Sequence, residues 1–172
     1  MKFLDESSVN TSMTRLYGRA AGGERVVESV PLHSGAQTTT LAVVGLTGLT
    51  GLAAPLVLDG AVNGHVFHAY IEQCVAPTLA PGDILLLDNL PAHKVAGVEM
   101  LVQARGACLI YLPPYSSDFN PIELVWSKVK TVLRRLKPRP PEALLEALRE
   151  ALLAITTQDI RGWFAHCGYA VT

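Results

Sequence analysis

Short apolar runs and longer amphipathic stretches follow one another along the chain and predict an α/β domain. The run at 84–87 is apolar at successive positions, as in a strand buried on both faces of a sheet. β-Branched or apolar content predicts further extended segments at 1–7, 24–32, 38–46, 54–60 and 107–115. Asp5 is expected near the end of the first strand. The order of segments predicts a mixed sheet, antiparallel early and parallel later.

Apolar positions spaced three and four residues apart predict helices around this sheet. Asn63 and Asn120 are suited to cap two of them, and Pro121 suits the first turn after Asn120. The expected helices cover 64–79, 91–106, 121–136, the segment from about 141 to 152, and 157–166.

Composition agrees with one globular domain over residues 1–172, since 49% of the residues are hydrophobic and 17% are charged. The net charge of −1 argues against a protein that binds nucleic acid through its overall charge, but it permits a local basic patch. Three widely spaced cysteines lack metal-site spacing and indicate reduced thiols in a cytoplasmic protein. Residues 29–58 carry no charge, yet their glycines and Pro55 favour two strands over a membrane span.

Three acids stand where such a sheet would build a site. Asp5 follows "KFL", Asp88 follows "ILLL", and Glu123 falls at the third position of a helix. Functional groups in open α/β sheets gather at the carboxyl ends of the strands. Each acid taken alone has another interpretation, because Glu123 can complement the helix dipole and Asp88 can be a turn residue.

Two segments, "LLLDNLPAHK" and "LPPYSSDFNPIELVW", hold Asp88 and Glu123 with 34 residues between the two acids. At this spacing they closely resemble the catalytic signatures of mariner-like cut-and-paste transposases. "FLDES", "GHVFHAYIEQCVAPTLAPGD" and "FAHCGY" resemble the bacterial insertion-sequence branch named six-thirty. The resemblance implies a ribonuclease-H-like fold, as in retroviral integrases, and the catalytic domain of a transposase that cleaves DNA strands and transfers them.

The resemblance also implies that Asp5, Asp88 and Glu123 are the catalytic triad and hold two Mg²⁺ or Mn²⁺ ions. Carboxylates suit this task because Mg²⁺ prefers hard oxygen ligands, and two ions can bridge the attacking and leaving oxygens of a phosphoryl transfer. The chain departs from the family at Ser117, where proline is usual. Asp118 is a rival third ligand, although its loop position favours a structural role.

DNA contacts are expected along a basic run in the helix that Glu123 opens, unless this run is only a solvated helix face. The candidates are Lys128, Lys130, Arg134 and Arg135. His93 matches a family position, where it either contacts a phosphate or lies near a helix start. Arg15 and Arg19 around Tyr17 are weaker candidates.

The implied partners are transposon ends and target DNA, bound by a homodimer or higher assembly, with no membrane. The family's N-terminal helix-turn-helix region is absent from this chain and is expected from a separate reading frame or a longer protein. Two alternatives remain open: a ribonuclease-H-like nuclease without strand transfer, and a non-catalytic remnant that binds DNA.

Overall fold

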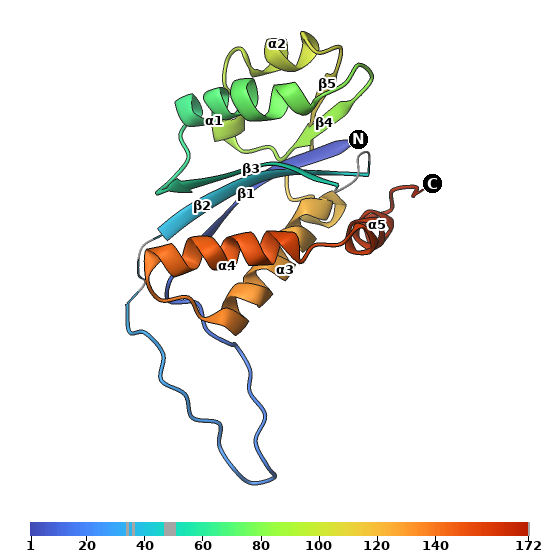
Figure 1. Cartoon of the computed structure of the whole chain (residues 1–172). Helices are drawn as coiled ribbons and strands as arrows, with labels where there is room; N and C mark the ends of the chain where they lie inside the picture. Colours follow the sequence, from blue (N-terminus) through green and yellow to red (C-terminus); the bar gives the residue numbers. More distant parts are fainter. Residues whose placement is uncertain (34, 36, 47–50, 172) are drawn as a thin grey trace.

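The computed structural model describes residues 1–33, 35, 37–46 and 51–171, and it is built around a five-stranded mixed sheet (Figure 1). The strand order is β3-β2-β1-β4-β5, with antiparallel pairs between the first three strands and parallel pairs on the other side of β1. The predicted mixed sheet is therefore confirmed. The strands are β1 (Lys2–Asn10), β2 (Gln37–Gly45), β3 (Leu52–Asp59), β4 (Ile84–Leu87) and β5 (Cys108–Tyr111).

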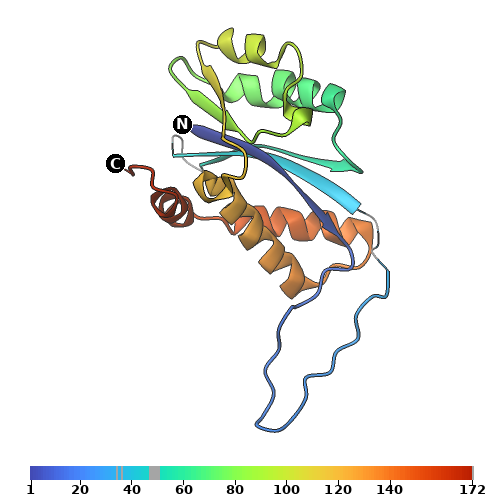
Figure 2. The ribbon, with the colours of Figure 1, turned by 180° about the vertical axis from the view of Figure 1, so that it is seen from behind.

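Helices cover both faces of the sheet, and the strands alternate their side chains between two apolar clusters (Figures 1 and 2). Phe3 and Leu86 pack toward α3, α4 and α5, whereas Leu4 and Leu87 pack toward α1 and α2. The bounds are α1 (Gly64–Tyr70), α2 (Val98–Gln103), α3 (Pro121–Leu136), α4 (Pro141–Leu153) and α5 (Thr157–His166).

The helix starts follow local chemistry in part. The Asn63 side chain accepts a hydrogen bond from Val66 N at 3.0 Å, as a capping residue should. Asn120 stands at the corresponding position of α3 but makes no capping bond, so that part of the prediction is wrong. The predicted helix over 91–106 is broken. A 3₁₀ turn at Pro91–His93 comes first, and α2 begins only after Gly97, whose φ of 93° no helix can include.

Residues 11–33 form a long extended loop that projects from the body between β1 and β2 (Figures 1 and 2). The strand predicted at 24–32 lies in this loop and does not form. Val27 and Leu32 are 85% and 90% exposed, so their β propensity has no neighbouring strand to pair with. Arg139 holds the base of the loop by donating to the carbonyl oxygens of Thr11 and Met13 at 2.8 and 3.3 Å.

The uncharged segment 29–58 contributes two strands, and its residues 34, 36 and 47–50 lie outside the described part. Among the helices that are described, none has the length and apolar character needed to cross a membrane.

Candidate active site

Asp5 and Asp88 meet where β1 and β4 stop pairing. The parallel register joins Leu4 to Leu87, so the two aspartates are the next residues along neighbouring strands. Both follow the alternation of Phe3 and Leu86 and therefore belong to the face covered by α3. Asp5 itself lies in the middle of β1, not near its end, because pairing with β2 extends the strand to Asn10.

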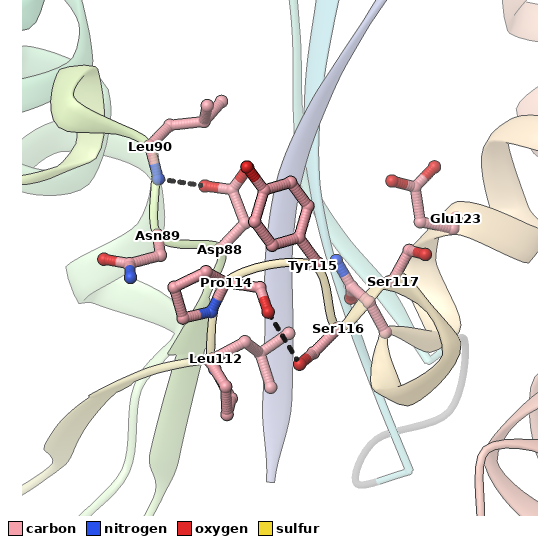
Figure 3. Close-up of a pocket in the computed structure, with 11 residues that line it drawn as sticks. Asp88, Asn89, Leu90, Leu112, Pro114, Tyr115, Ser116, Ser117 and Glu123 are labelled. Carbon is pink, nitrogen blue, oxygen red and sulfur yellow. Dashed lines mark hydrogen bonds between the residues drawn. The ribbon is translucent and has the colours of Figure 1, made fainter.

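Glu123 approaches the same place from the first turn of α3. The proline-rich loop after β5 leads to it, and Tyr169 Oη anchors this loop by donating to the carbonyl oxygen of Phe119 at 2.7 Å. Asp88, Asn120 and Glu123 line one cleft with this loop (Figure 3). The Asp88 side chain is 31% exposed and Glu123 is exposed, so both can reach a ligand in the cleft.

Asp5 is only 6% exposed, and its pKa is raised to about 7. Burial is the largest cause, and the negative charges of Glu123 and Asp88 add to it, while a backbone hydrogen bond from Glu6 opposes them. The three carboxylates are therefore electrostatically coupled. In the protein alone, the innermost one takes up a proton near neutral pH.

Asp88 behaves differently because two donors hold one of its oxygens. Leu90 N donates to Oδ1 at 3.2 Å, and His93 Nδ1 forms a short contact with the same oxygen. Burial raises the pKa of Asp88, but the hydrogen bond and charge of His93 outweigh it, and the pKa is lowered. Asp88 is thus kept ionised.

His93 is fully buried and stacks on Phe67, with ring centroids 4.5 Å apart. Burial lowers the pKa of His93, but the hydrogen bonds and charges of Asp88 and Glu6 outweigh burial. The pKa is therefore raised from 6.5 to about 9. Without exposed surface, His93 cannot meet a DNA phosphate in this structure, which corrects that expectation. No sequence signal marks Glu6 as its neighbour, because the two residues are far apart in the chain and meet only in the folded structure.

The acids do not form a closed cage in the protein alone. Among the described residues, no three His, Cys, Asp or Glu side chains stand close enough to hold a metal ion. The donor set nevertheless fits a hard divalent cation, because it consists of carboxylates whose mutual repulsion a cation would relieve. Asn120 also lines this cleft, and its buried Oδ1 has no hydrogen-bond partner among the described residues.

The remaining candidates are placed less centrally. Asp118 is exposed in a 3₁₀ turn and shares a second cleft with Glu123, but it does not line the cleft that contains Asp88. Lys128 is ion-paired with Asp159 at 2.5 Å, and Arg135 lies 3.6 Å from Glu150. Lys130 and Arg134 have no such pair among the described residues.

Tyr115 is a residue of the cleft that sequence reasoning missed. It is fully exposed, lines the cleft beside Asp88 and Glu123, and has a φ of 58° (Figure 3). This left-handed backbone is costly for a tyrosine. Its sequence context, directly after two prolines, gives no signal of this conformation.

Comparison with known proteins identifies a family for the chain. Residues 1–144 match the family described as DDE superfamily endonuclease. The Tc1 transposase of Caenorhabditis elegans is 25% identical over 99 residues, which is 58% of this chain and 36% of that protein.

The solved structures agree with the fold. A mariner Mos1 paired-end complex with magnesium gives a TM-score of 0.74 at 16% identity and covers 99% of this chain and 54% of that one. The Mos1 transposase catalytic domain with Raltegravir and manganese gives 0.66 at 14% identity, covering 99% and 80%. The predicted ribonuclease-H-like fold is therefore confirmed. The chain spans about a third of the length of the curated relative and about half of that of the paired-end Mos1 chain.

Proposed function

Because the chain belongs to the DDE superfamily endonuclease family, we propose that it is the catalytic domain of a DNA transposase. The reaction is metal-dependent cleavage of a DNA strand, followed by joining of the freed 3′ hydroxyl to target DNA. One observation carries the proposal. Two neighbouring strands and the first turn of α3 bring three electrostatically coupled carboxylates together, and two of them, Asp88 and Glu123, line one open cleft.

Asp5, Asp88 and Glu123 would hold two Mg²⁺ or Mn²⁺ ions. Bound ions of this kind activate the attacking oxygen and stabilise charge on the leaving oxygen. The chain contributes the positioning. Asp88 is ionised and already held through one oxygen, Asp5 regains its charge when a cation offsets the repulsion, and exposed Glu123 completes the set from α3.

The DNA backbone is proposed to follow one stripe of α3. At about 3.6 residues per turn, Lys130 and Arg134 lie about two and three turns after Glu123, within about 20° of its direction. They would meet phosphates roughly 10 and 16 Å from the carboxylate along the helix axis. Both are free of ion pairs within the described residues, which leaves their charge available to phosphates.

Lys128 and Arg135 belong to the opposite edge of the exposed surface of α3. Their pairs, Asp159 and Glu150, lie at α5 and α4, so these two cations connect helices. The basic run of the sequence thus separates into a stripe beside Glu123 and a pair that braces the helices. The weaker candidates Arg15 and Arg19 lie on the exposed loop, and a role for them in DNA binding stays a prediction.

A strand-transfer assay tests the proposed function. The full chain is incubated with Mn²⁺, a labelled duplex that ends in a 3′ hydroxyl, and a supercoiled plasmid, with Asp88→Asn beside it. Labelled plasmid formed by the wild type alone supports a transposase. Nicking without label transfer favours the hydrolytic nuclease, and DNA binding without metal-dependent cleavage favours the non-catalytic remnant.

Assembly and branch remain part of the proposal. The similarity to paired-end complexes of Mos1 supports DNA and a second protomer as partners. A helix-turn-helix region that binds transposon ends, and membership of the bacterial insertion-sequence branch, stay predictions from the sequence.

A further inference from the structure

We propose that His93, braced by Glu6, is a positioning residue that fixes the Asp88 carboxylate with one oxygen held by protein and the other turned to the cleft. The inference rests on the proposed function, in which Asp88 is a metal ligand. His93 would not contact the metal, the DNA or the reacting atoms, and would act only through Asp88.

The two oxygens of Asp88 are used unequally. Leu90 N and His93 Nδ1 both bond to Oδ1, whereas Oδ2 has no hydrogen-bond partner among the described residues. Asp88 lines the cleft and its side chain is 31% exposed. A carboxylate bonded on one side only presents its other oxygen as a single ligand in a defined direction.

The imidazole that holds Oδ1 is itself fixed from several sides. Its ring lies on Phe67 of α1 at an interplanar angle of 26°. Its backbone is tied at both ends, since His93 N donates to the carbonyl oxygen of Leu90 and Tyr111 Oη donates to the carbonyl oxygen of His93. The ring has no exposed surface. It cannot turn away from Asp88 without breaking this packing.

Glu6 supplies the second brace. It points to the α1 face of β1, where His93 stacks on Phe67, because it alternates with Asp5. Glu6 Oε2 and His93 Nε2 are both buried, and neither meets hydrogen-bond geometry with a described residue. Buried polar atoms are rarely left unpaired, and the inference assigns these two atoms to each other.

Asp5 and Glu6 are consecutive acids of β1 with different tasks. Asp5 would bind the metal ions, and Glu6 would brace His93. Asp5 faces the cleft side of the sheet and Glu6 faces the other side, so consecutive residues of β1 act on the two ends of one chain of contacts. Fixing a metal ligand through a second group typically changes metal affinity by roughly 10–100-fold.

The experiment compares His93→Leu with His93→Asn, which keeps a donor near the position of Nδ1. Mn²⁺ binding to the metal-free chain is measured by calorimetry, and folding by circular dichroism. His93→Leu should bind Mn²⁺ roughly 10–100-fold more weakly, with partial recovery in His93→Asn. His65→Leu, at an exposed histidine of α1, is the matched control and should bind like the wild type.

A second measurement needs no metal and no activity. The wild type should show a far-downfield imidazole proton in its NMR spectrum, which disappears in Asp88→Asn and moves in Glu6→Gln. Absence of this proton from the folded wild type overturns the inference. So does unchanged Mn²⁺ affinity in folded His93→Leu or, should that variant not fold, in Glu6→Leu. A wild type that shows the proton but binds no Mn²⁺ would instead overturn the proposed metal site.

Discussion

The three carboxylates stand on two sides of the site: a strand wall, formed by β1 and the end of β4, and a helix wall, formed by α3 and the loop before it. The two walls hold their carboxylates in different ways. On the strand wall, Asp5 is buried and Asp88 is bonded through one oxygen, so both carboxylates are held by their surroundings. On the helix wall, Glu123 is exposed and follows a loop whose Tyr115 is fully exposed. One wall is arranged before a ligand arrives, and the other can adjust to it.

The two walls differ in the free-energy cost of keeping their carboxylates ionised. Burial and like charges make the ionised form of Asp5 costly, as its raised pKa indicates, whereas His93 offsets the cost of burial at Asp88. Glu123, in contrast, is exposed to water. A site that binds cations can thus be prepared on one side only, with the third carboxylate added on binding.

The largest expected effect is on the rate of DNA cleavage, and it is the same for an acid from either wall. Asp88→Asn and Glu123→Gln should each lower the rate of DNA cleavage by roughly 10³-fold or more, since loss of either ligand removes several kcal/mol of metal-borne stabilisation. Asp118→Asn, in the neighbouring turn, is the control and should cleave like the wild type. Loss of cleavage in Asp118→Asn but not in Glu123→Gln would exchange the roles of these two acids.

Substitutions of acids from the two walls should differ in their effect on the free energy of unfolding. The pKa of Asp5 is raised from 3.8 to about 7 in the folded protein, so its ionisation opposes folding above pH 4, and the full cost is present above pH 7. Asp5→Asn should therefore stabilise the metal-free protein on the order of 2–4 kcal/mol at pH 8, with a gain that shrinks toward pH 4. Glu123→Gln should change stability by less than about 0.5 kcal/mol. Urea unfolding in EDTA at pH 5 and pH 8 measures both, and equal effects of the two variants would remove the distinction.

DNA binding tests how far the helix wall extends. Lys130→Gln with Arg134→Gln should weaken binding to every duplex and flatten the log-log salt slope by roughly 1.8, about 0.9 for each lost phosphate contact. Lys128→Gln with Arg135→Gln removes the same charge from the same helix and should leave the slope nearly unchanged. A salt titration with short duplexes compares the two variants, and equal slopes would mean that the stripe has no special part in binding.

The smallest effect is expected at Tyr115. Replacement by glycine removes the cost of a left-handed backbone and should stabilise the protein by up to about 1 kcal/mol. Tyr115→Ala is the matched control, because it removes the ring and keeps the strain. If thermal unfolding shows no gain for glycine over alanine, the loop does not hold this backbone strain in solution.

The sequence predicted the positions of the three acids better than it predicted the residues that hold Asp88 in place. Asp5 and Asp88 follow apolar strands, and Glu123 follows a helix start, so local patterns expose all three. The contacts of His93 could not be predicted from such a local pattern. Its surroundings, Phe67 and Glu6, come from α1 and β1, and only the folded chain brings them together.

Local propensity also failed where a partner or a backbone angle decided the outcome. The valines of 24–32 favour a strand, but none of the described strands lies beside them. The helix expected over 91–106 begins only after Gly97, whose left-handed φ is a property of the turn and not of the apolar pattern.

The position of β1 in the sheet has a consequence for how the protein is made. Strands β1, β2 and β3 pair through residues 2–59 and can form early, whereas β4 must add to the far edge of β1 and α3 must then dock over it. Contacts between distant parts of the chain form late in folding. A nascent chain on the ribosome would therefore hold Asp5 in paired strands before Glu123 is made, and the proposed metal site would stay incomplete until synthesis has passed α3.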